Sequence, residues 1–280
     1  MSFNQIHNNE DIFLHKTQIL ELLFSQTVTL IWRRLKHVKA APGRLVGIIL
    51  NPLVMLFAVG YLFVGALNVP GNQGAYIDYL TAGIAAQACL AGMGPTGVSV
   101  RLDADSGFMD RLRSLPLGRG IILFSHSIAD LLISLLAVLV MLIISYAMGW
   151  RSESNIEGFF VGLFIIMFFA YATVWLGVAV GLTVSNPETV DAFTSLLLII
   201  LTFFSSAILM PTALPQWLQP IVEWNPVSAV SAAVRSAWGN PMSPALGWAG
   251  SNAYILAIFW IFIFIIVSAT IAHRRFKHER

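Results

Sequence analysis

Charged residues are scarce in this sequence. Only 11% of its 280 residues are Asp, Glu, Lys or Arg, whereas 57% are hydrophobic. A soluble domain carries charge on about a quarter of its residues, so this chain cannot cover itself with a water-binding surface. The scarcity excludes an ordinary soluble globular protein and predicts an all-α polytopic membrane protein, organised as one membrane domain over residues 1–280.

Cysteine and nucleotide-binding loops are also lacking. The single cysteine, Cys89, lies in an apolar run and excludes an intramolecular disulfide. The Gly-rich stretch 92–97 has no Lys-Ser/Thr pair of the kind that cradles phosphate. We therefore expect that this chain binds no cofactor or metal and does not hydrolyse ATP by itself. Residues 1–46 are polar or amphipathic, which predicts no cleaved signal peptide.

Long apolar runs are what the sequence has in their place. About 20 apolar residues cross roughly 30 Å of hydrocarbon, and six runs reach that length. The predicted spans cover residues 46–67, 79–99, 121–148, 158–183, 190–210 and 253–272. Pro52 in the first span and Pro95 in the second predict helix kinks.

The basic residues lie almost entirely on one side of these spans. Cytoplasmic loops are enriched in Lys and Arg, so both termini, including a tail at 273–280, are predicted to be cytoplasmic in a bacterial inner membrane. Fourteen of the sixteen basic residues lie on that side: Lys16, Arg33, Arg34, Lys36, Lys39, Arg44, Arg101, Arg111, Arg113, Arg119, Arg274, Arg275, Lys277 and Arg280. Only Arg151 and Arg235 lie on the other.

Two segments predict helices that lie at the membrane surface. Within the lead-in 1–45, residues 18–39 place apolar side chains on one face and end in a basic cluster that includes Arg33 and Arg34, as an interfacial helix does. The connection 211–252 carries six prolines and four tryptophans, and it predicts two short re-entrant helices at 214–223 and 226–238. We expect Glu223 and Arg235 to pair across them. A surface loop with aromatic anchors is the alternative.

A polar island interrupts the apolar sequence at residues 101–119. It contains four arginines and three aspartates, with apolar residues between them, and Pro116 and Gly118 end the predicted amphipathic helix. Such a segment must lie outside the hydrocarbon. It is either a solvated loop or a docking element for a soluble partner.

A second polar feature is the pair His126 and Asp130, four residues apart on one helix face. The pair could perform acid–base chemistry in an integral-membrane transferase, or it could be a hydrogen-bonded structural pair. Few other titratable groups lie within the spans, so a carrier driven by its own proton chemistry is disfavoured. Energy would then come from a partner, unless the chain is a passive channel.

The residues of the polar island resemble a known family. Gly107-Phe-Met-Asp-Arg-Leu-Arg-Ser-Leu-Pro116 closely resembles the second-loop signature of type-2 permeases of ATP-binding-cassette exporters, most of all the daunorubicin-resistance group. Similar stretches occur at 185–188, at 201–207 with 214–218, and at 225–230 running on to Arg235. The resemblance covers most of residues 45–272.

The resemblance implies a permease that forms a dimer with a second copy or a paralogue. Each permease would contact a cytosolic ATPase subunit, which holds ATP and Mg²⁺ and moves a coupling helix in the loop between spans two and three. Nucleic acid is not expected as a partner. The implied ATPase contacts are Asp103, Asp105, Gly107, Phe108, Asp110, Arg111 and Arg113, with Arg33 and Arg34 nearby.

The implied activity is export of an amphipathic, drug-like or lipid-like substrate. The spans offer apolar and hydroxyl side chains but, on this interpretation, no charge partner. We expect the substrate path on faces of spans one, two and five, with Phe203 and Phe204 as members.

Overall fold

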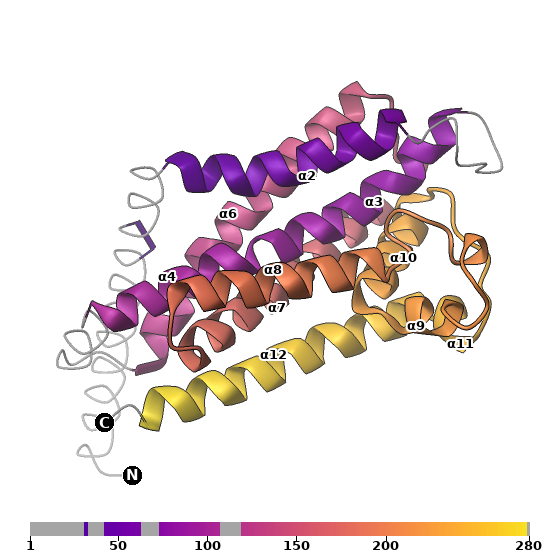
Figure 1. Cartoon of the computed structure of the whole chain (residues 1–280). Coiled ribbons are helices and arrows are strands. Elements are labelled where there is room, and N and C mark those ends of the chain that lie inside the picture. The colour runs from indigo at the N-terminus through magenta and orange to yellow at the C-terminus, as the bar shows by residue number, and fades with distance from the viewer. Residues whose placement is uncertain (1–30, 33–41, 63–72, 107–118, 279–280) are drawn as a thin grey trace, which may run out of the picture.

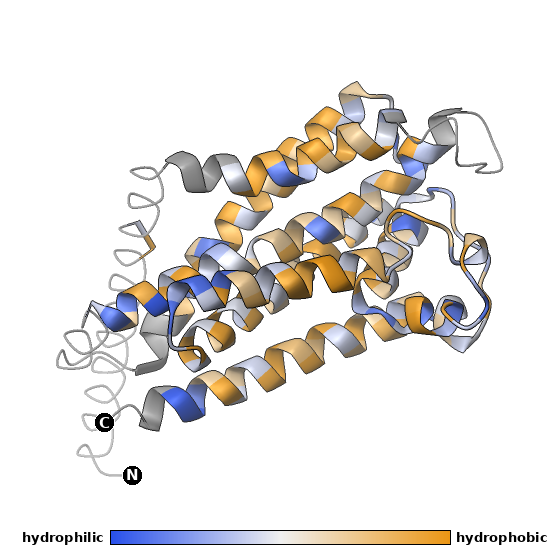
Figure 2. Ribbon diagram, viewed as in Figure 1, coloured by the Kyte–Doolittle hydropathy of each residue, from blue (hydrophilic) through white to orange (hydrophobic). Residues whose placement is uncertain are grey.

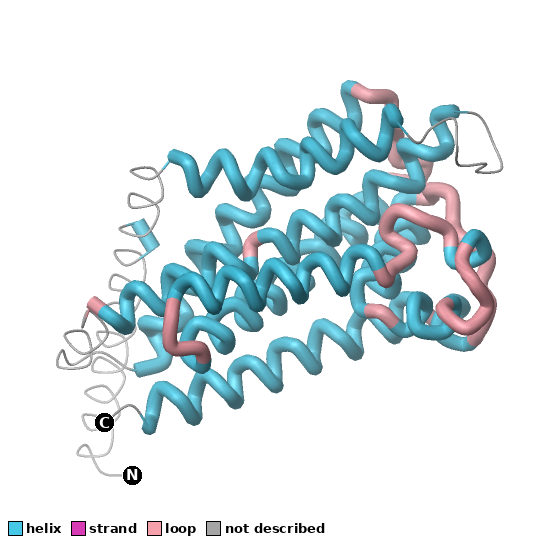
Figure 3. Tube along the Cα trace, in the orientation of Figure 1, coloured by secondary structure: helices cyan, strands magenta, loops and turns pink. Residues whose placement is uncertain are grey.

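The computed structural model describes residues 31–32, 42–62, 73–106 and 119–278, and this part of the chain is helical without strands. The long helices are α2 (Pro42–Leu62), α3 (Gln73–Ala91), α4 (Met93–Asp105), α6 (Arg119–Ala147), α7 (Ile156–Thr183), α8 (Pro187–Phe203) and α12 (Ala253–His278). The short helices are η1 (Pro211–Ala213), α9 (Gln219–Trp224), α10 (Pro226–Trp238) and α11 (Trp248–Ser251). The all-α prediction is confirmed for these residues, and Figure 3 shows helices joined by loops, with extended irregular segments between α8 and α12.

The long helices run roughly side by side and give the bundle two ends (Figure 1). At one end α4, α7 and α12 finish and α2, α6 and α8 begin. We call it the charged end, because Arg101, Arg274 and Arg275 lie there. At the opposite end, which we call the loop end, the chain between α8 and α12 forms η1 and α9 to α11. Between the two ends, hydrophobic residues dominate the helices (Figure 2).

Helix α7 is the central element of the bundle. It packs against α4, α6, α10 and α12, and its buried residues include many glycines and alanines that allow close approach. The Asn155 side chain caps its first turn by accepting a hydrogen bond from the Gly158 N–H at 3.0 Å. Because α7 contacts so many helices, a movement of α7 would displace most of the bundle.

Three helices are long and apolar enough to cross a membrane among the residues described: segments 124–147, 156–183 and 253–275. They coincide with the predicted spans three, four and six. A shorter apolar helix covers residues 47–61 in α2, which passes through Pro52 without interruption. The predicted interfacial helix at 18–39 lies outside the described residues, except that Ile31 and Trp32 are helical.

The predicted second span is wrong in one respect, because residues 79–99 form two helices that meet at Gly92. Pro95 has no N–H to donate to the carbonyl four residues earlier, and its ring crowds that carbonyl. That residue is Ala91, where α3 ends. The Thr173 hydroxyl of α7 donates to the Cys89 carbonyl at 2.9 Å and so satisfies an acceptor at the break.

The predicted fifth span is also too long. Helix α8 ends at Phe203, and residues 204–210 are irregular. A helix lies at the predicted bounds 226–238, but α10 is enclosed by α3, α7 and α12. The first short helix covers only residues 219–224, not 214–223. Because these three helices enclose it, α10 supports the fold of the loop end.

Trp238, the last residue of α10, anchors that helix to α7. Its side chain is buried, and its indole N–H donates to the Phe159 carbonyl at 3.2 Å. A Cβ at Gly162 would lie 2.2 Å from the indole nitrogen, so only glycine fits beneath the ring. Gly239, with φ of 69°, then ends α10 in the left-handed conformation that glycine adopts readily.

Candidate functional site

Arg235 of α10 is the most buried charged side chain at the loop end, with 1% of its surface exposed. The helix that carries it begins at Pro226, and the Asn225 side chain caps it by accepting from the Val227 N–H at 2.8 Å. The guanidinium points toward the irregular segment 204–210. A buried charge must be paired or fully hydrogen-bonded, so its partners decide what it does.

The partners of Arg235 are backbone carbonyls from two other elements. Its Nε donates to the Tyr79 carbonyl at 2.8 Å, and its Nη2 donates to the carbonyls of Ser206 and Ala207 at 2.9 and 3.0 Å. The guanidinium also lies 3.5 Å from the centre of the Tyr79 ring, a cation–π contact. Arg235 therefore joins α3, the end of α8 and α10.

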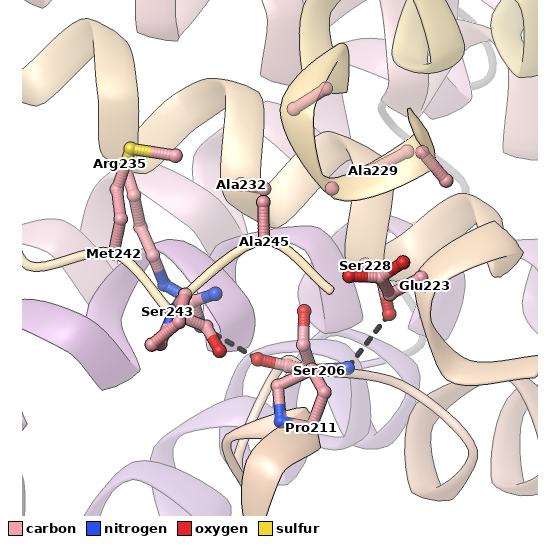
Figure 4. A pocket seen from close by; sticks show the side chains of 14 residues that line it. Ser206, Pro211, Glu223, Ser228, Ala229, Ala232, Arg235, Met242, Ser243 and Ala245 are labelled. Carbon is pink, nitrogen blue, oxygen red and sulfur yellow. Dashed lines mark hydrogen bonds between the residues drawn. The ribbon is translucent and has the colours of Figure 1, made fainter. Parts of the chain in front are cut away.

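The predicted Glu223–Arg235 pair is wrong for this reason. Arg235 donates to carbonyls instead, and Glu223 accepts from the Leu246 N–H at 2.6 Å. Both residues line a small hollow of about 30 Å³ with Ser206 and Ser228 (Figure 4). Glu223 thus holds the loop before α11, and Arg235 holds the segment after α8.

Further side chains form hydrogen bonds with backbone groups of the irregular segment after α8. The Ser206 N–H donates to the Ser228 hydroxyl at 2.7 Å, and the Tyr79 hydroxyl donates to the Ser206 carbonyl at 2.8 Å. Asn225 donates its amide to the Phe204 carbonyl at 2.8 Å. Irregular backbone at membrane depth is tolerated only where protein groups replace the missing helical bonds. The loop end is therefore built from directed hydrogen bonds.

Helices α4 and α7 meet differently, through backbone contact between glycines near the charged end. A Cβ on Gly181 would lie 2.3 Å from the Gly97 carbonyl oxygen, and one on Gly177 would lie 2.4 Å from the Met93 carbonyl oxygen. Neither backbone oxygen can move aside as a flexible side chain would. We call this contact of Gly97, Gly177 and Gly181 the glycine seam.

A polar cluster joins the end of α4 to the start of α6. His126 Nε2 and Asp103 Oδ2 lie 2.9 Å apart, and His126 Nδ1 lies 3.8 Å from Asp130 Oδ2. The predicted proximity of His126 and Asp130 is confirmed, and the structure adds Asp103, which α4 brings from 23 residues away. One more pair follows on α4: the Arg101 Nε donates to Asp105 Oδ1 at 3.0 Å. This hydrogen bond lowers the pKa of Asp105 below its ordinary value.

The larger cavity lies between α2, the break at Gly92 and the first half of α8. Its volume is about 270 Å³. Its polar lining comprises Asn51, Asp191, Thr194 and Ser195, and its other lining residues are Gly47, Ile48, Leu90, Ala91, Gly94, Pro95 and Leu198. We call it the α2–α8 cavity. It touches the three predicted spans, one, two and five, that were expected to carry a substrate path.

The sequence-predicted site residues are only partly brought together. Asp103 and Asp105 lie on the last turn of α4, at the charged end. Phe203 and Phe204, at the other end of α8, are 65% and 42% exposed and do not line the α2–α8 cavity. The remaining predicted contacts lie outside the described residues: Arg33, Arg34, Gly107, Phe108, Asp110, Arg111 and Arg113.

Two features were missed by sequence reasoning. Asp191 was not among the predicted site residues, although it is the second residue of the predicted span 190–210, and an acidic residue within a span signals a cavity-facing group. The role of Arg235 had no local signal, because its acceptors are backbone carbonyls of Tyr79, Ser206 and Ala207.

Comparison with known proteins finds relatives among transport permeases. The profile of the ABC-2 type transporter family matches residues 25–238. The daunorubicin resistance ABC transporter permease protein DrrB1 of Streptomyces coeruleorubidus is 30% identical over 211 residues, covering 75% of this chain and 74% of its own length. The putative transport permease ycf38 of Porphyra purpurea is 29% identical over 227 residues, covering 80% and 75%. The probable doxorubicin resistance permease protein DrrC of Mycobacterium tuberculosis is 28% identical over 215 residues, covering 70% and 75%.

Proposed function

The chain belongs to the ABC-2 type transporter family, and from that premise we propose that it is the membrane-spanning subunit of an ATP-driven exporter. Its substrate would be an amphipathic, drug-like or lipid-like molecule that leaves the cell. The observation that carries the proposal is the family match over residues 25–238, which includes both ends of the bundle. Relatives named for daunorubicin and doxorubicin resistance support the drug-like class.

Six spans follow from this proposal: α2, α3 with α4, α6, α7, α8 and α12. Successive members of this set run in alternating directions between the two ends, as a polytopic chain requires. The charged end would be cytoplasmic, because Arg101, Arg274 and Arg275 lie there and, of the basic residues that the structure describes, only Arg151 and Arg235 lie toward the other end. The short helices α9 to α11 would then lie at the outer leaflet.

The partner would be a cytosolic ATPase subunit that binds ATP and Mg²⁺. Asp103 and Asp105 end the helix that leads into residues 107–118, the segment proposed to contact that subunit. The glycine seam supports transmission of its movement, because α4 cannot shift without displacing α7 at the backbone. The ATPase can bias the membrane part only if it binds the two conformations of that part differently.

A second permease copy or paralogue would complete the membrane part. Helix α8 supports this proposal, because it packs mainly on α4 and leaves an apolar face exposed. The exposed apolar residues of that helix include Phe193, Leu196, Ile199, Ile200 and Phe203. A path for the substrate would run through the α2–α8 cavity, with Phe203 and Phe204 nearer its outer end.

The test is ATP-driven transport by the permease reconstituted with the ATPase subunit encoded beside it. We expect substrate movement that needs ATP and both subunits. Reversing the charges of Asp110 and Arg111 together should abolish coupled transport while membrane insertion stays normal. The matched control reverses Arg151 and Glu153 at the other end of the bundle and should transport normally. Normal export by the Asp110/Arg111 variant would contradict the coupling role.

The same preparation separates the alternative functions. A transferase would form a covalent product without ATP, and His126→Ala would abolish it. A passive channel would conduct in liposomes that lack the ATPase. Either result, in the absence of ATP-driven transport, would overturn the exporter.

A further inference from the structure

The α2–α8 cavity holds one charged side chain among the residues described as lining it, the carboxylate of Asp191. The other described lining residues are apolar apart from the neutral groups of Asn51, Thr194 and Ser195, and none of them is Lys or Arg. A lone carboxylate in such a lining is the kind of polar group that sets which ligand a largely apolar pocket accepts.

Asp191 is held at the helix break by its place on α8. The helix begins at Pro187, so Asp191 lies one turn in, followed by the apolar stretch that runs to Phe203. Its Oδ1 lies 3.7 Å from the position that a Cβ on Gly94 would take, which places the carboxylate against the Gly94–Pro95 turn of α4. No described side chain forms an ion pair or hydrogen bond with this carboxylate. The nearby Thr194 hydroxyl donates to the backbone carbonyls of Val190 and Asp191, at 2.8 and 3.1 Å, and not to the Asp191 side chain.

The break between α3 and α4 offers one backbone acceptor to the same cavity. Ala91 lines the cavity, and Pro95 cannot donate to its carbonyl because proline has no N–H. The helix ends add little net potential, because the negative carboxyl end of α3 adjoins the positive amino end of α4, whose Gly94 and Pro95 also line the cavity. The carboxylate of Asp191 is therefore the source of negative charge among the described lining residues.

We propose that Asp191 is a specificity-determining residue that makes the α2–α8 cavity select amphipathic cations. The carboxylate recognises a positively charged amine or ammonium group, and Ile48, Leu90 and Leu198 contact the apolar remainder. This inference rests on the proposed exporter function and corrects the expectation that the spans offer no charge partner. The cavity lies toward the charged end, where the anionic lipids of a cytoplasmic leaflet would concentrate such cations.

The test uses a matched pair of probes, 6-phenylhexyltrimethylammonium and its neutral isostere with carbon in place of nitrogen. Equilibrium binding of each is measured to the permease–ATPase complex in nanodiscs, with empty nanodiscs subtracted. We expect the wild-type complex to bind the cation more tightly than the isostere. Asp191→Asn should weaken cation binding about fivefold, as for one partly solvated charge pair, and leave isostere binding unchanged. Asp191→Glu should retain the preference.

The control is Glu188→Gln, which removes a carboxylate that is exposed, as Asp191 is, and that lies in the first turn of the same helix but outside the cavity lining. It should leave the preference intact. Equal effects of the two neutral variants would assign the preference to general surface potential and overturn the proposal. So would equal binding of the two probes, or no binding of either, by the wild-type complex. ATP hydrolysis and transport in the same preparation test the exporter separately, because both would persist if only the cation preference were wrong.

Discussion

The two ends of the bundle are held together by different kinds of contact. At the loop end, Arg235 and its neighbours hold an irregular segment by hydrogen bonds of fixed direction to particular carbonyls. At the charged end, α4 and α7 touch through glycine backbone, and α8 stands partly away from α2 across a cavity of about 270 Å³. Directed bonds to buried groups are lost in an all-or-none manner, whereas apolar helix faces can slide by small amounts.

This difference suggests how a movement at the charged end could change the arrangement of the helices between the two ends. The loop end should behave as a rigid base, because moving it would leave several buried carbonyls without donors. The charged end can move as a unit of α4 and α7, and such a movement would change the α2–α8 cavity. The predictions below test whether the loop end is the more rigid of the two.

Arg235→Met should have the largest effect. It removes three buried hydrogen bonds, to the carbonyls of Tyr79, Ser206 and Ala207. The Ser206 carbonyl keeps the Tyr79 hydroxyl as a donor, and each buried group left unsatisfied costs about 1–3 kcal/mol. We expect a loss of about 3 kcal/mol or more in unfolding free energy, measured by thermal unfolding in detergent. Arg151→Met is the matched control, because that arginine is exposed. If the two variants melted at similar temperatures, the claim that the loop end is the more rigid end would be contradicted.

Gly181→Ala should have the next largest effect. The new Cβ would lie 2.3 Å from the Gly97 carbonyl oxygen, so α4 and α7 must move apart. Overpacking of this kind costs about 1–3 kcal/mol, and we also expect reduced ATP-driven transport per ATP hydrolysed. Gly60→Ala in α2 is the control, since its Cβ would meet only the side-chain ends of Met148 and Leu80 at 3.4 and 3.6 Å, and it should stabilise α2 by about 0.5–1 kcal/mol. Unchanged melting and coupling in the Gly181 variant would show that the glycine seam is not tight.

His126→Ala should have a smaller effect, which tests the link between α4 and α6. It removes the 2.9 Å contact with Asp103, which is partly exposed, so a loss of about 1 kcal/mol is expected. Because Asp103 ends the helix that leads into the proposed coupling segment, transport should fall more than ATP hydrolysis does. His273→Ala, an exposed histidine of α12 at the same end, is the control. Equal losses of transport and hydrolysis would argue for a merely structural contact.

Sequence reasoning predicted those parts of the fold that depend on apolar length. Helices α6, α7 and α12 lie close to the predicted spans, because about 20 apolar residues in a row have few alternatives to a long helix. Pro95 was noticed as a source of distortion, but whether a helix bends or breaks depends on neighbours such as Thr173, which satisfies the Cys89 carbonyl. The early end of α8 depends likewise on Tyr79 and Arg235.

The loop-end site could not be predicted because the groups that accept hydrogen bonds from Arg235 are backbone carbonyls, and every residue has one. The Tyr79 carbonyl lies 156 residues from Arg235, and any residue at that position would offer the same group. Glu223 was the obvious charge partner in the sequence, and the fold uses it for the Leu246 N–H instead. Asp191 differs, because its place at the start of the predicted span 190–210 was visible, but the cavity beside it exists only once α2, α4 and α8 are assembled.

The smallest effect is expected from Asp105→Asn, measured as a change in the pH dependence of stability. The hydrogen bond from Arg101 holds the pKa of the Asp105 carboxyl below its unfolded value of about 3.9. A lowered folded pKa contributes stability that is present above the unfolded pKa and is lost as the pH falls through the folded one. The wild-type melting temperature should therefore fall slightly more than that of the variant between pH 6 and pH 3. Because Asp105 is exposed, the difference should also shrink in high salt, whereas the effect of Arg235→Met should not, since its bonds are buried. If salt weakened both equally, the contrast between a directed, buried loop end and a solvated charged end would be lost.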